Sequence, residues 1–552
     1  MATDVNVPSG RDKDVWRQLR ANPYILGLSA FASLGGFLFG YDQGVVSGVL
    51  TMENFAAHFP RVYLDAGYKG WFVSTLLLLA WLGSLVNGPV SDKLGRKGSM
   101  LLAVVVFTLG AALQAGGSNI ETIFAGRAVA GFAVGMLTMV VPQYMSEVST
   151  PTVRGTLVVL QQLSITLGIL VSYWLEYGTQ YIGGHRCAPD IPYSGGTPQN
   201  APSIRSATSA PRAAQASPRR RGASPSRCRS SRPWEDKALK ALAQLRRCHP
   251  DSEGLRHEFL AIKAEVLFDE AIARDRHLGK SGVLLYVAQY ADLVSTWPSF
   301  KRLAIGCCIM FFQQFIGCNA IIYYAPQIFS QLGLSGGTTG LLATGVYGIV
   351  NTLSTLPALF LIDKVGRRPL LMCGAAGTCL SLVIVGGILG GYGDTLPAHP
   401  AAGWVGVAFV YIYDINFSYS FAPIGWVLPS ETFNLGNRSK AMAVTTSTTW
   451  MCNFVIGLVT PDMLDRLGWG TYIFFAAFAL IALVFTYFFI PETRGKSLED
   501  MDGVFGDTAA REEKARLFGI AARVGLVDDR VPEEKEKIEA ARVGALEVER
   551  RV

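Results

Sequence analysis

The chain has 552 residues, of which 50% are hydrophobic and only 16% are charged. An ordinary soluble chain carries about 25% charged residues. The composition therefore excludes the three or four soluble domains that ~150 residues per domain would suggest. It also excludes disordered, collagen-like and disulfide-scaffold proteins. The net charge is +7, but much of the basic excess lies in one unusual segment, so it gives no argument for nucleic acid as a partner.

Long uncharged apolar runs begin shortly after the polar N-terminal residues. A transmembrane helix needs about 20 mostly apolar residues to cross about 30 Å of hydrocarbon, and eleven runs of this kind are present. In the first half they are Tyr24–Leu50, Trp71–Ser91, Gly98–Ala115, Thr122–Ser146 and Gly155–Leu175. In the second half they are Leu303–Gln331, Thr339–Ile362, Pro369–Gly391, Gly403–Leu428, Ala441–Thr460 and Leu467–Ile490. Their length favours helices over the short alternating strands of a barrel, and no cleavable signal peptide is expected.

Lysine and arginine near the ends of the spans predict their orientation. Basic clusters lie in alternate loops, so these loops and both termini are expected in the cytosol. One crossing is then missing, because the fifth span ends outside near Glu176 and the next span starts inside at Arg302. Between Ile191 and Trp234 the chain has eight Arg, no Lys and no Asp or Glu, with many Ser, Pro and Ala. Such low-complexity composition cannot cross a bilayer.

The two halves of the chain resemble each other. VSDKLGRKG follows the second span, and LIDKVGRRP follows the eighth when the missing span is counted. A basic-acidic signature comes two spans later in each half, in PQYMSEVSTPTVRG and in LPSETFNLGNR. Internal repeats of spans are typical of transporters whose substrate site lies between the halves near the middle of the membrane.

Several motifs then identify a family. GFLFGYDQGVVSG, GRAVAGFAVG, RGTLVVLQQLSITLGIL, FFQQFIGCNAIIYYAP, DKVGRR and PETRGKSLEDMD occur in this order. Together they make the chain resemble the sugar-porter branch of the major facilitator superfamily, close to fungal monosaccharide transporters. The resemblance implies an all-α membrane fold of two pseudo-symmetric six-helix halves. The sixth helix is missing or mistranslated here, because the Arg/Ser/Pro tract stands in its place.

We interpret the tract from Ile191 to Pro233 as a frame-slipped or mis-spliced translation. A genuine long loop is the alternative, and sequencing the transcript decides between the two. The expected division of the chain is a cytosolic tail (1–20), a first transmembrane half (21–184), the Arg/Ser/Pro-rich segment (185–233), a cytosolic helical linker (234–301), a second transmembrane half (302–492) and a cytosolic tail (493–552). Helical periodicity within Trp234–Arg276 predicts amphipathic helices packed under the bundle.

Asp42 lies within the first span, where an ionised carboxylate is costly and usually functional. An interfacial or capping Asp is the alternative interpretation. The resemblance to proton-coupled sugar porters implies a proton acceptor at this position. Arg127 in the fourth span is its expected partner, because a nearby guanidinium favours the charged carboxylate.

Amide side chains in the apolar runs suit a neutral polyol, which needs hydrogen-bond donors, acceptors and aromatic faces. Hydrogen bonds between helices are the alternative role for each amide. The resemblance implies substrate contacts from a set of amide and aromatic residues, with the last two weaker candidates: Gln162, Gln313, Gln314, Asn319, Asn351, Trp426, Asn453 and Phe39. On a regular helix Asn319 would point over ~100° away from Gln313 and Gln314, so we expect Gly317 to break the helix.

Charged residues of the two repeats are expected to form cytosolic ion pairs that keep the outward-facing state closed. This gate consists of Asp92, Arg96, Glu147 and Arg154 in one half and Asp363, Arg367, Glu431 and Arg438 in the other. Topology determinants and solvated charges are the alternative. Asp414 in the tenth span is an acid that the family pattern does not contain; a second coupling carboxylate and a sequencing error are the two alternatives for it. Phe421-Ala422-Pro423 and Thr449-Trp450 also depart from that pattern.

The expected function is transport of a monosaccharide through the plasma membrane, coupled to protons, by alternating access. Uncoupled diffusion of sugar and a non-transporting sugar sensor are the alternatives, and the missing helix leaves open that the chain as written is inactive. The expected partners are the sugar, protons and the lipid bilayer, without nucleic acid. No cofactor, metal or enzymatic activity is expected.

Overall fold

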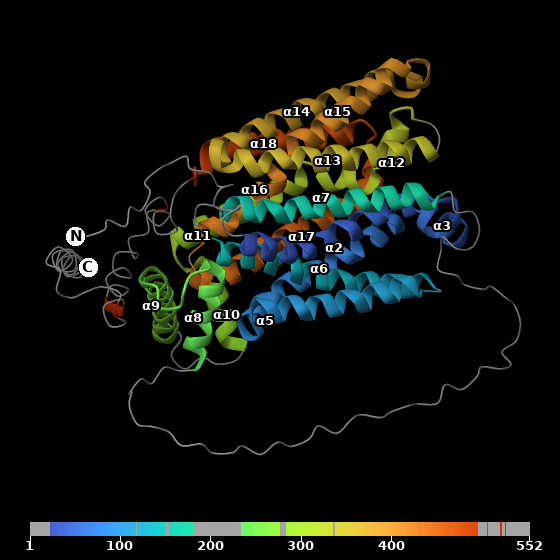
Figure 1. Ribbon diagram of the computed structural model, residues 1–552. Helices are drawn as coiled ribbons and strands as arrows, with labels where there is room; N and C mark the ends of the chain where they lie inside the picture. Colours follow the sequence, from blue (N-terminus) through green and yellow to red (C-terminus); the bar gives the residue numbers. More distant parts are fainter. Residues whose placement is uncertain are drawn as a thin grey trace, which may run out of the picture.

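The computed structural model describes residues 23–117, 119–149, 154–180, 233–276, 283–334, 337–433 and 435–494, with a few isolated positions beyond them. Within these residues every regular element is a helix. Figure 1 shows long helices running side by side, with shorter helices gathered at one end of the bundle. The Arg/Ser/Pro tract, the place of the sixth span and the C-terminal tail lie outside the described residues.

The first half contains four long helices and two short ones: α2 (Pro23–Val49), α3 (Glu53–His58), α4 (Pro60–Leu64), α5 (Ala66–Ala115), α6 (Ile120–Val148) and α7 (Arg154–Thr179). Helix α5 combines the second and third expected spans. The two spans meet at Gly95, whose φ of 74° is a left-handed backbone conformation that glycine adopts without steric cost. The turn that the sequence predicts between them is therefore concentrated in one residue.

The second half is built from broken and continuous helices: α11 (Trp297–Phe315), α12 (Cys318–Gln331), α13 (Gly337–Val365), α14 (Arg367–Tyr392), η1 (Gly393–Ala398), α15 (Pro400–Ser418), α16 (Phe421–Thr432), α17 (Leu435–Arg466) and α18 (Gly470–Phe489). Helices α11 and α12 together form one expected span, and α15 and α16 form another. All eleven expected spans thus coincide with helices. In the described part of the chain, nine helical stretches are long and apolar enough to cross a membrane; α5 is counted once, and the span formed by α15 and α16 is not among the nine.

The linker between the halves forms α8 (Pro233–Arg246), α9 (Glu253–Arg276) and α10 (Val283–Ser295), as the periodicity of the first two predicts. These helices lie together at one end of the bundle (Figure 1). The Tyr290 hydroxyl of α10 donates a hydrogen bond to the Leu85 carbonyl of α5 at 3.2 Å. Burial and the nearby Asp92 carboxylate raise the pKa of Tyr290 to about 12, so the phenol keeps its proton at neutral pH and holds α10 to the bundle.

The two halves meet along α7 with α13 and along α5 with α17. Within the first half, α5 packs along α6 and α2 packs along α7. Glycines allow these helices to approach closely, as is usual in membrane bundles. A Cβ on Gly40 of α2 would meet the Ile165 carbonyl oxygen of α7, and a Cβ on Gly135 of α6 would meet the Ala80 carbonyl oxygen of α5.

Replacing Gly40 with Ala is expected to destabilise the bundle by about 2–3 kcal/mol, because α2 and α7 must separate to admit one methyl group. The matched control is Gly27→Ala in the same helix, where a Cβ would have no atom within 4 Å. Thermal unfolding of the detergent-solubilised chain measures the difference. Equal melting temperatures for the two variants would contradict the close contact between α2 and α7.

Candidate functional site

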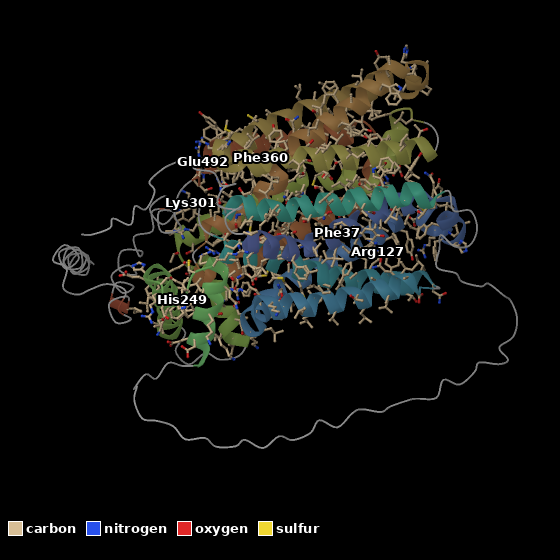
Figure 2. All side chains as sticks on the ribbon, viewed as in Figure 1. Phe37, Arg127, His249, Lys301, Phe360 and Glu492 are labelled. Atoms are coloured by element: carbon tan, nitrogen blue, oxygen red, sulfur yellow. The ribbon has the colours of Figure 1, made fainter. Side chains whose placement is uncertain are left out.

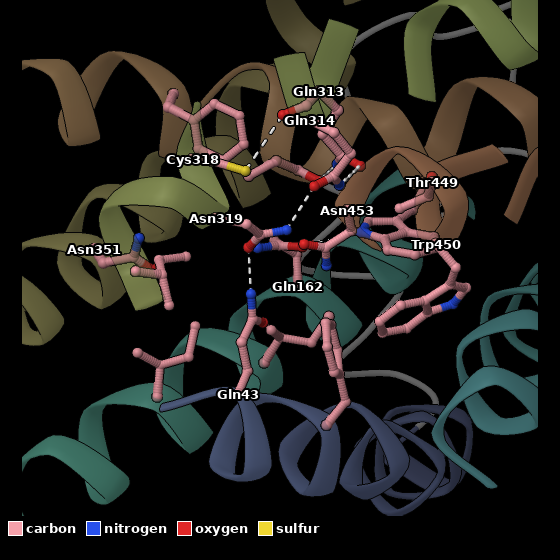
Figure 3. A pocket seen from close by; sticks show the side chains of 17 residues that line it. Gln43, Gln162, Gln313, Gln314, Cys318, Asn319, Asn351, Thr449, Trp450 and Asn453 are labelled. Carbon is pink, nitrogen blue, oxygen red and sulfur yellow. Dashed lines mark hydrogen bonds between the residues drawn. The ribbon is translucent and has the colours of Figure 1, made fainter. Parts of the chain in front are cut away.

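A cavity of about 50 Å³ lies between the two halves. Amide side chains form much of its wall: Gln43, Gln162, Gln313, Gln314, Asn319, Asn351 and Asn453. Aromatic rings add flat surfaces: Phe39, Phe417, Trp426 and Trp450. None of the residues that line this cavity is Asp, Glu, Lys, Arg or His. The space admits a few water molecules, so the two halves lie close together around it in this conformation (Figure 3).

The break between α11 and α12 brings amides of one span together, as the sequence predicts. Helix α11 ends at Phe315, and Gly317 has a φ of 98° before α12 begins. This left-handed conformation suits glycine and rotates the following turn. As a result the Asn319 Nδ2 donates to the Gln314 Oε1 at 2.5 Å, although the two side chains would diverge on a regular helix.

These amides form a chain that crosses from one half to the other. Gln43 on α2 donates through Nε2 to the Asn319 Oδ1. Gln314 donates to the Gln313 Oε1 at 3.4 Å, and Gln313 donates to the Phe421 carbonyl at 3.0 Å. The Phe421 carbonyl belongs to the first turn of α16, just after the second helix break. The break at Gly317 therefore brings the amides together, and the amide of Gln313 binds a backbone carbonyl at the second break.

Two tryptophans of the second half also contact the first half. The Trp426 indole donates to the Gln162 Oε1 at 3.1 Å. The Trp450 indole donates to the Thr138 Oγ1 at 3.0 Å, and its ring packs edge-on against Phe39 with 4.9 Å between centroids. Each indole thus presents an apolar face and a fixed polar edge at the cavity.

The resemblance assigns eight residues to substrate contacts, and all eight are found in the wall of this one cavity. Their order in the sequence alone does not require them to lie together. Gln43 follows Asp42 in GYDQG but is not among the residues predicted for the site, and Thr449-Trp450 is predicted only as a departure from the family pattern. Gln161, an amide in the same run as Gln162, is buried away from the cavity and both of its polar atoms lack a hydrogen-bond partner.

Asp42 and Arg127 are both buried, but they do not form the expected direct pair. The Arg127 guanidinium donates to the Phe72 carbonyl at 2.8 Å and to the Val73 carbonyl at 3.2 Å. Among the described residues no ion pair within 4.0 Å includes Asp42, and its Oδ2 has no hydrogen-bond partner. The two charges still interact electrostatically. In this conformation the hydrogen-bond partners of Arg127 are therefore backbone carbonyls of α5 and not the Asp42 carboxylate.

Two further buried carboxylates lie within the helices. Glu176 of α7 accepts a hydrogen bond from the Gly48 amide of α2 at 3.1 Å. Asp414 of α15 accepts one from the Asn351 Nδ2 of α13 at 2.7 Å. Asp414, to which the family pattern assigns no role, thus lies against an amide of the cavity wall.

Equivalent ion pairs form in the two halves at the end of the bundle that carries the linker helices, where Figure 2 labels Glu492; we refer to this end as the charged end. In the first half, Arg96 pairs with Glu147 at 2.8 Å and with Asp92 at 3.5 Å. In the second half Arg367 pairs with Glu431 at 2.7 Å and with Asp363 at 2.9 Å. The repeat predicted from the sequence therefore has the same local geometry in both halves.

Some of these groups also join one half to the other. Asp92 pairs with Lys440 at 3.1 Å and accepts a hydrogen bond from the Ser439 hydroxyl at 2.9 Å. Asp363 accepts one from the Thr156 hydroxyl at 2.9 Å. The charged end is therefore closed by contacts between the halves in this conformation.

The two remaining arginines of the expected gate behave differently. The Arg154 side chain lies outside the described residues. Arg438 is buried and donates to the Phe433 carbonyl, with both distances 3.4 Å. These contacts tie the start of α17 to the segment that follows α16, within one half.

Glu492, which follows α18, caps the start of α14. Its carboxylate oxygens accept hydrogen bonds from the backbone amides of Arg367 and Arg368, both at 3.1 Å. Backbone amides at a helix start lack partners within the helix and favour negative charge. The adjacent Thr493 hydroxyl donates to Glu431 at 2.9 Å. The PETRG motif thus fixes the arginine of the charged end in place.

Two helical halves around a neutral cavity, closed at one end by ion pairs, are an arrangement typical of polytopic membrane transporters. The model of the family described as "Sugar (and other) transporter" matches residues 28–190 and 234–505. The chain therefore belongs to the sugar transporter family of the major facilitator superfamily. The match is interrupted at the Arg/Ser/Pro tract.

Curated fungal relatives cover most of the chain. "Probable quinate permease" of Aspergillus clavatus is 32% identical over an alignment of 508 residues, and the match covers 87% of this chain and 87% of its own. "MFS glucose transporter mfs1" of Aspergillus flavus is 29% identical over 495 residues, covering 87% of this chain and 89% of its own.

Solved structures share the fold. The proton:xylose symporter XylE bound to 6-bromo-6-deoxy-D-glucose superimposes with a TM-score of 0.61 at 22% identity, covering 88% of this chain and 99% of that one. The inward open conformation of XylE from E. coli gives 0.59 at 23% identity, with 87% and 100% covered. This likeness shows that the two halves have the major facilitator arrangement.

Proposed function

We propose that this chain carries a neutral monosaccharide across the plasma membrane together with a proton, by alternating access. The observation that carries this proposal is the cavity between the halves, whose lining contains seven amides and no charged side chain. Amides offer both donors and acceptors to hydroxyl groups, and the indoles of Trp426 and Trp450 offer flat faces to a sugar ring.

The relatives leave two substrate classes to decide between, because one is named for quinate and another for glucose. Quinate carries a carboxylate, and burying an anion requires a cation or several strong donors. The lining of the cavity contains no Lys, Arg or His. A neutral sugar therefore fits this cavity better than a carboxylate does.

Proton coupling is assigned to Asp42. Its carboxylate is buried, its Oδ2 has no hydrogen-bond partner, and Arg127 is held by the carbonyls of α5. A carboxylate without a close cation gains a proton more readily than one paired with arginine. If Arg127 approaches Asp42 in another conformation, the proton is released there. XylE, which has a similar fold, is described as a proton:xylose symporter.

The charged end is proposed to face the cytosol and to act as the gate of the outward-facing state, with both termini on the same side. The ion pair between Asp92 and Lys440 and the hydrogen bond from the Thr156 hydroxyl to Asp363 join the two halves at this end. The ion pair between Lys440 and Asp92 is partly exposed, and such pairs contribute about 1 kcal/mol or less each, so this contact between the halves can break in each cycle.

The Arg/Ser/Pro tract at 191–233 is proposed to be a frame-slipped or mis-spliced stretch in place of the sixth helix. The interruption of the family match between residues 190 and 234 supports this hypothesis. A transcript that encodes the tract in frame would refute it.

Uptake by cells that lack their own hexose transporters and express the full chain tests the function. We expect accumulation of labelled glucose, xylose or galactose, competition by unlabelled sugars, no competition by excess quinate, and loss of accumulation with a protonophore. Uptake that equilibrates and ignores the protonophore would indicate uncoupled diffusion. No sugar uptake with a sugar-dependent signal would indicate a sensor, and strong competition by quinate would overturn the substrate class.

A further inference from the structure

Asp414 belongs to a polar contact between α13 and α15 that lies behind the cavity wall. Tyr347 and Asn351 are one turn apart on α13, and Asp414 and Ser418 are one turn apart on α15. The two helices pack against each other, and the Asn351 Nδ2 donates to the Asp414 Oδ1 at 2.7 Å. The acid and the amide therefore meet at the center of this helix pair.

This contact is not an ion pair. In the described part of the chain no Lys or Arg nitrogen lies within 4.0 Å of Asp414, whose side chain is completely buried. The hydrogen bond from Asn351 is the one that satisfies its Oδ1. A buried acid is costly, so its position against a residue of the cavity wall points to a role for the pair.

The amide of Asn351 has two chemically opposite ends. Its Nδ2 is engaged by Asp414, whereas its Oδ1 is buried and has no hydrogen-bond partner in the protein. Asn351 lines the cavity on the side opposite Thr449 and Trp450 (Figure 3). Buried polar atoms usually have a hydrogen-bond partner, and because Asn351 lines the cavity, a ligand in the cavity can supply the partner of this oxygen.

An ionised carboxylate only accepts hydrogen bonds, whereas the neutral acid carries one O–H donor beside its accepting carbonyl oxygen. The ionised form of Asp414 can therefore hold the NH2 group of Asn351 and cannot hold its oxygen. An amide at position 414 could not select in this way, because it presents an oxygen or an NH2 group according to its rotation. Only the ionised acid fixes which end of Asn351 is free.

We propose that Asp414 is a positioning residue that orients the Asn351 amide so that its oxygen faces the cavity and accepts a hydrogen bond from one hydroxyl group of the sugar. The proposal rests on the proposed function and adds a specificity rule to it. At that ring position the site demands a hydrogen-bond donor. A substituent that only accepts, such as fluorine, meets an oxygen and is rejected.

The test compares glucose with a set of analogues in which each hydroxyl in turn is replaced by fluorine. Inhibition of labelled glucose uptake by each analogue is measured on the full chain and on Asp414→Asn. At one ring position the unchanged chain is expected to bind the fluoro analogue at least about tenfold more weakly than glucose, the size of one lost hydrogen bond. In Asp414→Asn the Asn351 amide can turn its NH2 group to the fluorine, and the difference is expected to fall to about twofold.

Ser418→Ala is the matched control, because Ser418 lies one turn from Asp414 on α15 and is not among the residues that line the cavity; it should keep the tenfold difference. The double variant Asn351→Asp with Asp414→Asn reverses the pair and again leaves an oxygen toward the cavity, so it should restore rejection of fluorine. An Asp414→Asn variant that loses affinity equally for glucose and every analogue would overturn the proposal. If the unchanged chain transports no sugar, the proposed function fails instead.

Discussion

Asp42→Asn is expected to abolish uphill accumulation of sugar while preserving its exchange. A gradient of one pH unit is worth about 1.4 kcal/mol per proton, which supports about a tenfold sugar gradient when one proton moves with one sugar. Asn keeps the size of the side chain and its acceptor oxygen but cannot gain or lose a proton. The accumulation ratio should therefore fall from about ten to about one, while labelled sugar still equilibrates and exchanges.

Vesicles with a defined pH difference measure both quantities on the same preparation. The matched control is Glu176→Gln, which replaces another buried carboxylate of the first half and keeps an acceptor for the Gly48 amide. It should accumulate sugar as the unchanged chain does. Undiminished accumulation by Asp42→Asn would exclude Asp42 as the coupling residue, and loss of exchange would show that Asp42 also supports the fold or the site.

The positions of the helices could be predicted from the sequence because the signal is long and local. A run of about 20 apolar residues has few alternatives in a membrane, and each of the eleven expected spans coincides with a helix. The break at Gly317 was also predictable, because amides on both sides of a glycine needed it to share a surface. The observed φ of 98° confirms that reasoning.

Contacts between helices were harder to predict because a sequence does not give the rotation and height of one helix relative to another. Asp42 and Arg127 are plausible partners by charge, yet Arg127 binds the Phe72 and Val73 carbonyls. Gln43 reaches Asn319 across the two halves, a pairing over 276 positions that no local pattern indicates. The role of Asp414 likewise depends on α15 lying beside Asn351 of α13.

Arg367→Gln is expected to destabilise the protein much more than Arg96→Gln, although the two arginines occupy equivalent positions in the repeat. The Arg367 side chain is 4% exposed and faces Glu431 and Asp363, whereas the Arg96 side chain is 26% exposed. Removing one partner of a buried pair leaves uncompensated charge and costs about 3–5 kcal/mol. A partly exposed pair contributes about 1 kcal/mol or less.

Thermal unfolding in detergent compares the two variants, and the melting temperature should fall by a clearly larger amount for Arg367→Gln. The cause is tested by adding Glu431→Gln, because removing the Glu431 charge takes away much of the penalty and should restore part of the lost stability. The same second change, Glu147→Gln, should do little for Arg96→Gln. Equal losses in the two halves would mean that burial does not distinguish these arginines, and that the charged end behaves as a symmetric set of solvated pairs.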